Sequence, residues 1–211
     1  MRKQFDEQLA KIKEMLCDMC KTDAVAVKQA NGALRVKDVA AARGVKAHER
    51  AADRFEADIE RMCMTVIVKQ QPVAHDLTFV TAAMKMVTDL ERISDQAADI
   101  ADITVRTADR NFLLPPALAG LMETAENMVD RCARAIENDD AAQAKIICKT
   151  DDVADGLFER VKEDLTHGEY SADGEVALDM LMVAKYLERI CDHCVNVAEW
   201  VLFSVGERDW L

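Results

Sequence analysis

Leu90-Glu91-Arg92-Ile93-Ser94-Asp95 is the stretch that decides the fold, because it recurs almost unchanged as Leu187-Glu188-Arg189-Ile190-Cys191-Asp192, 97 positions later. At about 100° per residue, the two acids of each copy share one face of a helix, and Asp99 and Asp102 extend the first copy's acidic stripe. The leucine and isoleucine of each copy fall on the opposite side. The sequence therefore predicts a duplicated helix with an apolar face inside and acids left free outside.

The composition favours long helices and excludes several classes of protein. Of 211 residues, half are apolar, while only 7 are Gly and 3 are Pro, so there are few helix breakers. The net charge of −12 argues against binding nucleic acid or an anionic membrane surface. No window reaches the ~18–20 apolar residues of a membrane span, and no secretory signal is present. Seven cysteines without a disulfide pattern favour a reducing cytoplasm.

Apolar residues at three-and-four spacing predict six amphipathic helices. They cover residues 3–36, 39–69, 75–109, 116–138, 141–166 and 175–205. Asp38 and Asp140 stand where helix N-caps belong. Gly32 lies inside the first helix, because the apolar pattern continues after it. Pro72 ends the second helix, and the Pro-Pro pair at residues 115–116 marks a boundary.

The two halves of the chain align with each other beyond the repeated motif. An offset of 102 superposes Asp38 on Asp140 and Glu49 on Asp151, and the last helix of each half uses the offset of 97. The fold class is therefore all-α, with two tandem antiparallel three-helix bundles. We assign residues 1–112 to the first bundle, 113–206 to the second and 207–211 to a short tail.

Acid pairs at i,i+4 spacing recur on the last two helices of each half. Each like-charge pair costs roughly 0.2–0.5 kcal/mol, which a multivalent cation held between neighbouring helices would reverse. Carboxylate oxygens suit Fe³⁺, Mn²⁺, Mg²⁺ or Ca²⁺ better than Zn²⁺. The candidate ligands are Glu49, Asp53, Glu91, Asp95, Asp99, Asp151, Asp155, Glu188, Asp192 and Glu199. Two alternatives stay open: a solvated acidic face, or pairing of these acids with Arg92 and Arg189.

Three segments resemble the PhoU family. They are QPVAHDL at residues 71–77, MVTDLERISD at 86–95 and AKYLERICDHCVNVAEW at 184–200. The resemblance implies a non-enzymatic cytoplasmic regulator that restrains phosphate uptake and the phosphate-starvation response of the Pho regulon. It also implies that the chain links the ATP-binding subunit of a phosphate ABC transporter to a sensor histidine kinase. Members of the family are often homodimers, and some bind iron or other metal clusters on the acid motifs.

The chain departs from the family pattern at three places. Ser94 and Cys191 stand where the family commonly has glycine, and both are small enough to permit close helix approach. Thr78 replaces an arginine that the family favours, which removes a possible contact to an anion or a partner. Because no basic anion nest is visible, we do not expect direct phosphate binding.

Other metal and enzyme classes remain as alternatives. Cys17-x-x-Cys20 and Cys191-x-x-Cys194 are either a four-thiolate zinc site or small core residues. His193 is either a further metal ligand or a hydrogen-bonded side chain. The absence of Glu-x-x-His and of a Walker loop argues against a ferritin-like di-iron enzyme and an ATPase. A metal-storage or carboxylate-bridged metallo-oxidase bundle remains as an alternative, as does a metal-free homodimeric scaffold.

Overall fold

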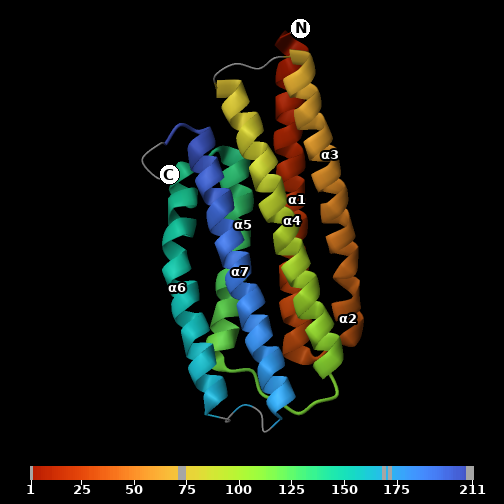
Figure 1. The fold of residues 1–211 in the computed structure, drawn as a ribbon, viewed down its shortest axis with the longest axis vertical. Helices are drawn as coiled ribbons and strands as arrows, with labels where there is room; N and C mark the ends of the chain where they lie inside the picture. Colours follow the sequence, from red (N-terminus) through yellow and green to blue (C-terminus); the bar gives the residue numbers. More distant parts are fainter. Residues whose placement is uncertain (1, 71–74, 168–169, 171–172, 208–211) are drawn as a thin grey trace.

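The protein consists of two antiparallel three-helix bundles that lie side by side (Figure 1). This computed structural model describes residues 2–70, 75–167, 170 and 173–207, and these contain helices and no strand. The helices are α1 (Arg2–Val36), α2 (Val39–Gly44), α3 (Lys46–Gln70), α4 (His75–Thr107), α5 (Pro116–Asn138), α6 (Ala141–Thr166) and α7 (Gly174–Ser204). The prediction of an all-α fold with two three-helix bundles is confirmed.

The predicted second helix is wrong in one respect, because it breaks at Val45 into the short α2 and the long α3. In a continuous helix the Val45 N–H would bond to the Ala41 carbonyl. Here Gln29 of α1 donates to that carbonyl over 2.7 Å, and the Val45 N–H bonds to Ala42 instead. Gly44 makes room, since a Cβ there would lie 2.6 Å from the Gln29 amide nitrogen. A side chain from another helix thus causes the break.

The capping residues occupy equivalent positions in the two halves. The Asp38 carboxylate accepts from two backbone N–H groups at the start of α2, and the Asp140 carboxylate does the same at the start of α6. Each follows a left-handed residue, Lys37 with φ 57° and Asp139 with φ 51°. Both predicted N-caps are confirmed, as is the continuity of α1 through Gly32. The predicted break at Pro72 and most of the predicted tail fall outside the described residues.

The two bundles meet through their inner helices. α1 packs on α5 and α4 packs on α7, while α3 and α6 each contact only their own bundle within the described ranges. Figure 1 shows α3 and α6 as the two flanks of the molecule. One continuous apolar core runs through both bundles, with Leu90, Ile93, Leu187 and Ile190 fully buried in it. The predicted inner face of the repeated motif is confirmed.

Charged pairs set the register of α1 against α5. Every cation of this set lies on α1, and every acid lies on α5 or the residue after it. The pairs are Lys13–Asp139 at 2.6 Å, Lys21–Glu137 at 3.0 Å, Lys28–Asp130 at 2.7 Å and Arg35–Glu123 at 3.7 Å. Each is partly exposed and stabilises the fold by no more than about 1 kcal/mol. Together they favour one antiparallel alignment of the two bundles.

In the described part of the chain, no helix has the length and apolarity of a membrane span.

Candidate metal centres

The first acidic centre, which we define as Asp53, Glu91 and Asp95, lies between α3 and α4. Each of these residues offers a carboxylate oxygen, and the three oxygens lie within 4.8 Å of one another. Asp53 comes from α3, while the i,i+4 spacing of the other two places both on one face of α4. The structure therefore brings together three of the predicted ligands from two helices.

Glu91 is the most perturbed acid of the first acidic centre. Its side chain is only 15% exposed, and its Oε2 atom has no hydrogen-bond partner. Burial, and after it the charge of Asp95, raises the pKa of Glu91 to about 7. A carboxyl group in this position loses hydration without gaining a hydrogen bond, and a cation beside it would relieve that cost.

The prediction that Glu91 and Asp95 lie free outside is wrong. Arg92 Nε lies 3.3 Å from Glu91 Oε2, an ion pair without hydrogen-bond geometry. Arg92 Nη1 also donates to Asp95 Oδ2 over 3.2 Å. The cause is local, because Arg92 follows Glu91 directly and lies three residues before Asp95, within reach of both on the helix surface. Arg92 thus partly neutralises the first acidic centre.

The second acidic centre, defined as Asp151, Asp155, Glu188 and Asp192, lies between α6 and α7. The Asp151 Oδ1 atom is buried without a hydrogen-bond partner. Burial, followed by the charges of Asp155 and Asp192, raises the pKa of Asp151 to about 6. Lys185 Nζ donates to Glu188 over 2.5 Å. Within the described residues, only the first acidic centre gathers three ligand oxygens as closely as 4.8 Å.

The remaining predicted ligands lie around these centres rather than in them. Burial is the largest cause that raises the pKa of both Glu49 and Asp99, and the charge of Asp95 is the second. Both acids therefore border the first acidic centre. Glu199 instead acts on Cys148 of α6. Burial is the largest cause that raises the pKa of this thiol, and the charge of Glu199 is the second. Glu199 therefore lies near the Cys148 thiol.

Asp23 is a residue that sequence reasoning missed. It lies on α1 with no exposed surface, and neither of its carboxylate oxygens has a hydrogen-bond partner. Burial first, and then the charge of Glu91, raises the pKa of Asp23 well above its usual range. A signal was present in the sequence, because Asp23 stands at apolar spacing between Met19 and Val27, both fully buried.

His193 is hydrogen-bonded across the seam between the bundles. Its Nδ1 atom lies 2.9 Å from Asp89 Oδ1 on α4, and Asn196 donates to the same oxygen over 2.9 Å. This arrangement agrees with the hydrogen-bonded alternative for His193. Ser94 and Cys191, the two small residues of the repeated motif, are both buried on helices that pack against each other.

The four cysteines of the possible zinc site are core residues. Cys17, Cys20, Cys191 and Cys194 are free and buried, and they do not form a metal-sized group among the described residues. Burial is the main cause that raises the pKa of all four thiols. Neutral thiols in an apolar setting are poor zinc ligands, so the core alternative fits the structure.

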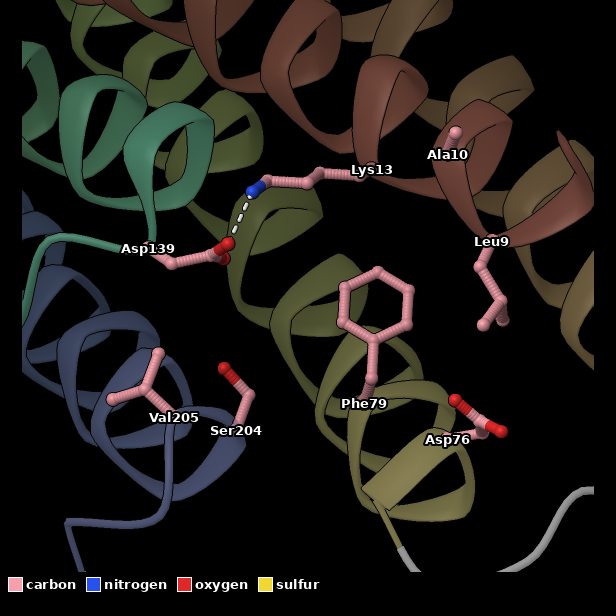
Figure 2. A pocket seen from close by; sticks show the side chains of 8 residues that line it. All are labelled: Leu9, Ala10, Lys13, Asp76, Phe79, Asp139, Ser204 and Val205. Carbon is pink, nitrogen blue, oxygen red and sulfur yellow. Dashed lines mark hydrogen bonds and ion pairs between the residues drawn. The ribbon is translucent and has the colours of Figure 1, made fainter. Parts of the chain in front are cut away.

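A cavity of about 410 Å³ lies at one end of the molecule, between α1, α4 and the end of α7 (Figure 2). Phe79 and Leu9 supply apolar walls, and Lys13 is held by Asp139 across the cavity at 2.6 Å. Asp76 adds a second acid to the lining. With one paired lysine against two acids, this cavity disfavours phosphate, and none of the predicted metal ligands lines it.

The donor sets of both acidic centres fit hard metal ions. The donors are carboxylates, each centre spans two neighbouring helices, and each contains a buried oxygen without a hydrogen-bond partner, Glu91 Oε2 in one and Asp151 Oδ1 in the other. Oxygen-only sites of this kind suit Mg²⁺, Ca²⁺, Mn²⁺ or iron. A bound cation would supply positive charge that offsets the repulsion among these acids.

Comparison with known proteins identifies the family. Residues 16–104 and 118–201 each match the PhoU domain. A Burkholderia protein named phosphate-specific transport system accessory protein PhoU homolog is 32% identical over 98% of this chain and 90% of its own length. A Mycobacterium tuberculosis homologue of the same name, numbered 1, is 29% identical over 97% of this chain and 94% of its own.

Solved structures agree with the observed fold. The crystal structure of PhoU from Pseudomonas aeruginosa superposes with a TM-score of 0.89 at 25% identity, covering 96% of this chain and 99% of that one. The phosphate transport system regulatory protein PhoU from Streptococcus pneumoniae gives 0.88 at 21% identity, covering 97% and 98%, and supports the fold alone. On this evidence, the chain belongs to the PhoU family.

Proposed function

We propose that this chain is a regulatory accessory protein of phosphate-specific transport in the cytoplasm. It restrains phosphate uptake and the phosphate-starvation response by linking the ATP-binding subunit of a phosphate ABC transporter to a sensor histidine kinase. The observation that carries this proposal is the family match in both halves of the chain. The printed name of the Burkholderia relative, of which the chain spans 90%, supports the connection to phosphate transport.

The surface chemistry supports an adaptor that recognises protein rather than phosphate. Arg106 and Arg110 lie in a cavity of about 340 Å³ at the end of α4, but both are engaged by acids. Arg106 pairs with Asp179, and Arg110 lies 2.7 Å from Asp173 and 3.3 Å from Glu175. The net charge of −12 favours partners with basic surfaces. We expect the chain to act as a homodimer.

The two acidic centres are the second part of the proposal, as sites for hard metal ions such as iron, Mn²⁺, Mg²⁺ or Ca²⁺. The support is geometric, since three carboxylate oxygens lie within 4.8 Å in the first centre. In this function the ion holds α3 to α4 and α6 to α7, so that each outer helix is fixed to its bundle.

The regulatory role is tested in cells. Deleting the gene is expected to raise phosphate uptake and switch on the starvation response in phosphate-rich medium. A tagged copy of the chain is expected to co-purify with the transporter's ATP-binding subunit and the sensor kinase. Normal phosphate control in the deletion strain, together with no recovery of either partner, would refute the proposal.

The metal role is tested on purified protein. Elemental analysis compares the wild type with one variant that carries Asp53→Asn and Asp95→Asn and another that carries Asp155→Asn and Asp192→Asn. We expect each variant to lose the metal of one centre and keep the other. Turnover of a redox substrate by the metal-loaded wild type would favour the metallo-oxidase alternative. A metal-free wild type after growth and dialysis with these ions would refute the metal role and leave the adaptor role to stand on the cellular test.

A further inference from the structure

The cavity of about 410 Å³ at the end of the molecule is built by both bundles (Figure 2). Three apolar side chains line it from α1, from α4 and from the residue after α7, namely Leu9, Phe79 and Val205. Because α1 and α4 belong to the first bundle and α7 to the second, the cavity forms only when the two bundles pack together. Its volume is within the range of pockets that hold ligands or anchoring side chains.

The polar lining of this cavity is acidic. Lys13 Nζ donates to Asp139 Oδ2 over 2.6 Å, so the lysine of the lining is already engaged. Asp76 lies in the first turn of α4, where its charge favours the helix start, and within the described ranges it has no ion-pair partner. With two acids against one lysine, a positively charged group is the polar ligand that this cavity favours.

The opposite end of the molecule shows how an equivalent turn is covered. The offset of 102 pairs Asp139, after α5, with Lys37, after α1, and both have a left-handed backbone. Figure 1 shows these two helix ends at opposite ends of the molecule. Lys37 Nζ lies 4.1 Å from the centre of the Phe112 ring, and Phe112 is only 6% exposed. An aromatic ring of the chain itself, with a cation on it, therefore covers this turn.

The space beside Asp139 stays open instead. The same offset pairs Phe112 with Ala10, which lines the cavity. The two residues lie in different local structure, since Ala10 is on α1 and Phe112 precedes α5. One end of the molecule thus has a turn covered by a ring and a cation, and the other has an open cavity with apolar walls and excess acid.

We propose that this cavity is a docking pocket for a basic segment of a partner protein, which inserts an aromatic side chain next to a lysine or arginine. The ring packs on Leu9, Phe79 and Val205, where contact between aromatic rings adds to the burial of apolar surface. The cation is attracted by Asp76 and Asp139, and the net charge of −12 favours the approach of a basic segment. This inference rests on the adaptor role proposed above and gives it a contact chemistry.

Binding is measured with the full-length protein and a capped glycine-rich peptide that carries one phenylalanine next to one arginine. The methyl signals of Leu9 and Val205 in NMR spectra locate the peptide and give its dissociation constant. A control peptide with alanine in place of phenylalanine is expected to bind about tenfold or more weakly, as loss of an interface anchor does. A second control with glutamate in place of arginine is also expected to bind more weakly, by a margin that salt reduces.

Variants of the chain test the pocket itself. Ala10→Phe supplies a ring from α1 and is expected to weaken peptide binding about tenfold or more, because it takes the space of the peptide's ring. Ala40→Phe is the matched control, since Ala40 is also exposed but does not line the cavity, and it should stay within about twofold. The pair Asp76→Asn and Asp139→Asn is expected to weaken binding about two- to fivefold at low salt. Circular dichroism checks that each variant is folded.

The same variants are tested in cells against the adaptor role. Ala10→Phe in the tagged chain is expected to lower the recovery of the transporter's ATP-binding subunit or of the sensor kinase. Ala40→Phe is expected to leave the recovery of both unchanged. Recovery of both partners at the wild-type level with Ala10→Phe would show that neither docks in this cavity, while the adaptor role would stand.

Other occupants of the cavity would also overturn the inference. Equal binding of the three peptides, or no shift of the Leu9 and Val205 signals, would exclude recognition of a ring beside a cation. Much tighter peptide binding by Trp210→Ala would assign the cavity to the chain's own C-terminal residues. Dissociation of a dimer by Ala10→Phe in size-exclusion chromatography would assign it to a second copy of the chain. Failure of the wild type to recover either partner would refute the adaptor role as well.

Discussion

The first and second acidic centres occupy equivalent places in the repeat, yet a different acid is most perturbed in each. In the first it is Glu91, on the inner helix α4, with a pKa near 7. In the second it is Asp151, on the outer helix α6, with a pKa of about 6. The first half also carries the buried acid Asp23, while the offset of 102 places Ala125 at that position in the second half. The two halves of the repeat therefore differ in their buried charge as well as in their acidic centres.

The arginines of the two copies of the motif, Arg92 and Arg189, also act on different acids. Arg92 pairs with both α4 acids of its own centre. Arg189 acts across the seam, where its charge lowers the pKa of Asp99 on the other bundle, against the larger raising effects of burial and of Asp95. The second centre uses Lys185 as its cation instead, paired with Glu188. Equivalent positions therefore give different ion pairs once the bundles pack against each other.

Replacing the motif leucines tests whether the two cores are equal. Leu90 and Leu187 are both fully buried, so Leu90→Ala and Leu187→Ala are each expected to lower the free energy of unfolding by about 2–5 kcal/mol. Urea denaturation followed by circular dichroism measures the loss. Leu178→Ala, at a position that is 65% exposed, serves as the control and should change little. A loss below about 1 kcal/mol at one leucine only would break the equivalence of the cores.

Exchanging the buried residues Asp23 and Ala125 tests the difference between the two cores directly. Ala125→Asp places an acid in the second core and is expected to lower the stability of the metal-free protein by about 1–3 kcal/mol. Asp23→Ala removes the buried acid and is expected to raise it by up to a similar amount, less the effect of a small cavity. Thermal unfolding in chelator measures both. A destabilised Asp23→Ala would show that Asp23 has a stabilising partner in the metal-free state.

The pH dependence of stability separates the two centres. Glu91 has a folded pKa of about 7, above its usual 4.5, so the native state binds more protons than the unfolded state between these values. Stability of the metal-free protein therefore falls as pH rises through this window, by on the order of 1–2 kcal/mol after discounting for partial exposure. Denaturation at a series of pH values in chelator measures this.

Two variants assign the pH effect to its centre. Glu91→Gln is expected to remove the share of Glu91 in the decline up to about pH 7, while the share of Asp23, whose pKa burial also raises, remains. Asp151→Asn is expected to remove only the part between its usual value of 3.8 and its folded pKa of about 6. A profile that is flat between pH 5 and pH 8 in the wild type would contradict the environment described for Glu91.

Removing one of two neighbouring like charges is expected to have the smallest effect on stability. Asp192→Asn is expected to stabilise the metal-free protein by roughly 0.2–0.5 kcal/mol. Asp95→Asn is expected to give less, because it also breaks the ion pair with Arg92. Chemical denaturation in chelator compares the two variants. An equal or larger gain for Asp95→Asn would show that the ion pair between Arg92 and Asp95 contributes nothing to stability.

Sequence periodicity predicted the features that depend on a single helix or on the repeat. It placed Leu90 inside, Asp38 and Asp140 at helix starts, and the acid pairs on neighbouring helices of each bundle. These follow from helical geometry and capping chemistry, which act over a few residues.

Sequence periodicity could not predict features that depend on contacts between helices. The break at Val45 arises because Gln29 of α1 bonds to the Ala41 carbonyl, which periodicity within residues 39–69 does not reveal. The effect of the Glu91 charge on Asp23 could not be predicted without knowing which face of α1 meets α4. The pairing of Arg92 with both Glu91 and Asp95 depends on the side-chain conformation that Arg92 adopts beside a partly buried acid.

The packing of α1 on α5 and of α4 on α7 has a consequence during synthesis. The first bundle leaves the ribosome 97 residues ahead of the end of α7, since α4 ends at Thr107 and α7 at Ser204, and at about 5–20 residues per second this is an interval of roughly 5–20 seconds. Throughout that interval the inner face of α4 has no complete α7 to cover it, whereas α5 becomes available to α1 earlier. The nascent chain therefore carries an exposed apolar surface for seconds, which makes it a substrate for chaperones that bind emerging polypeptides and a point of risk for pairing between neighbouring nascent chains.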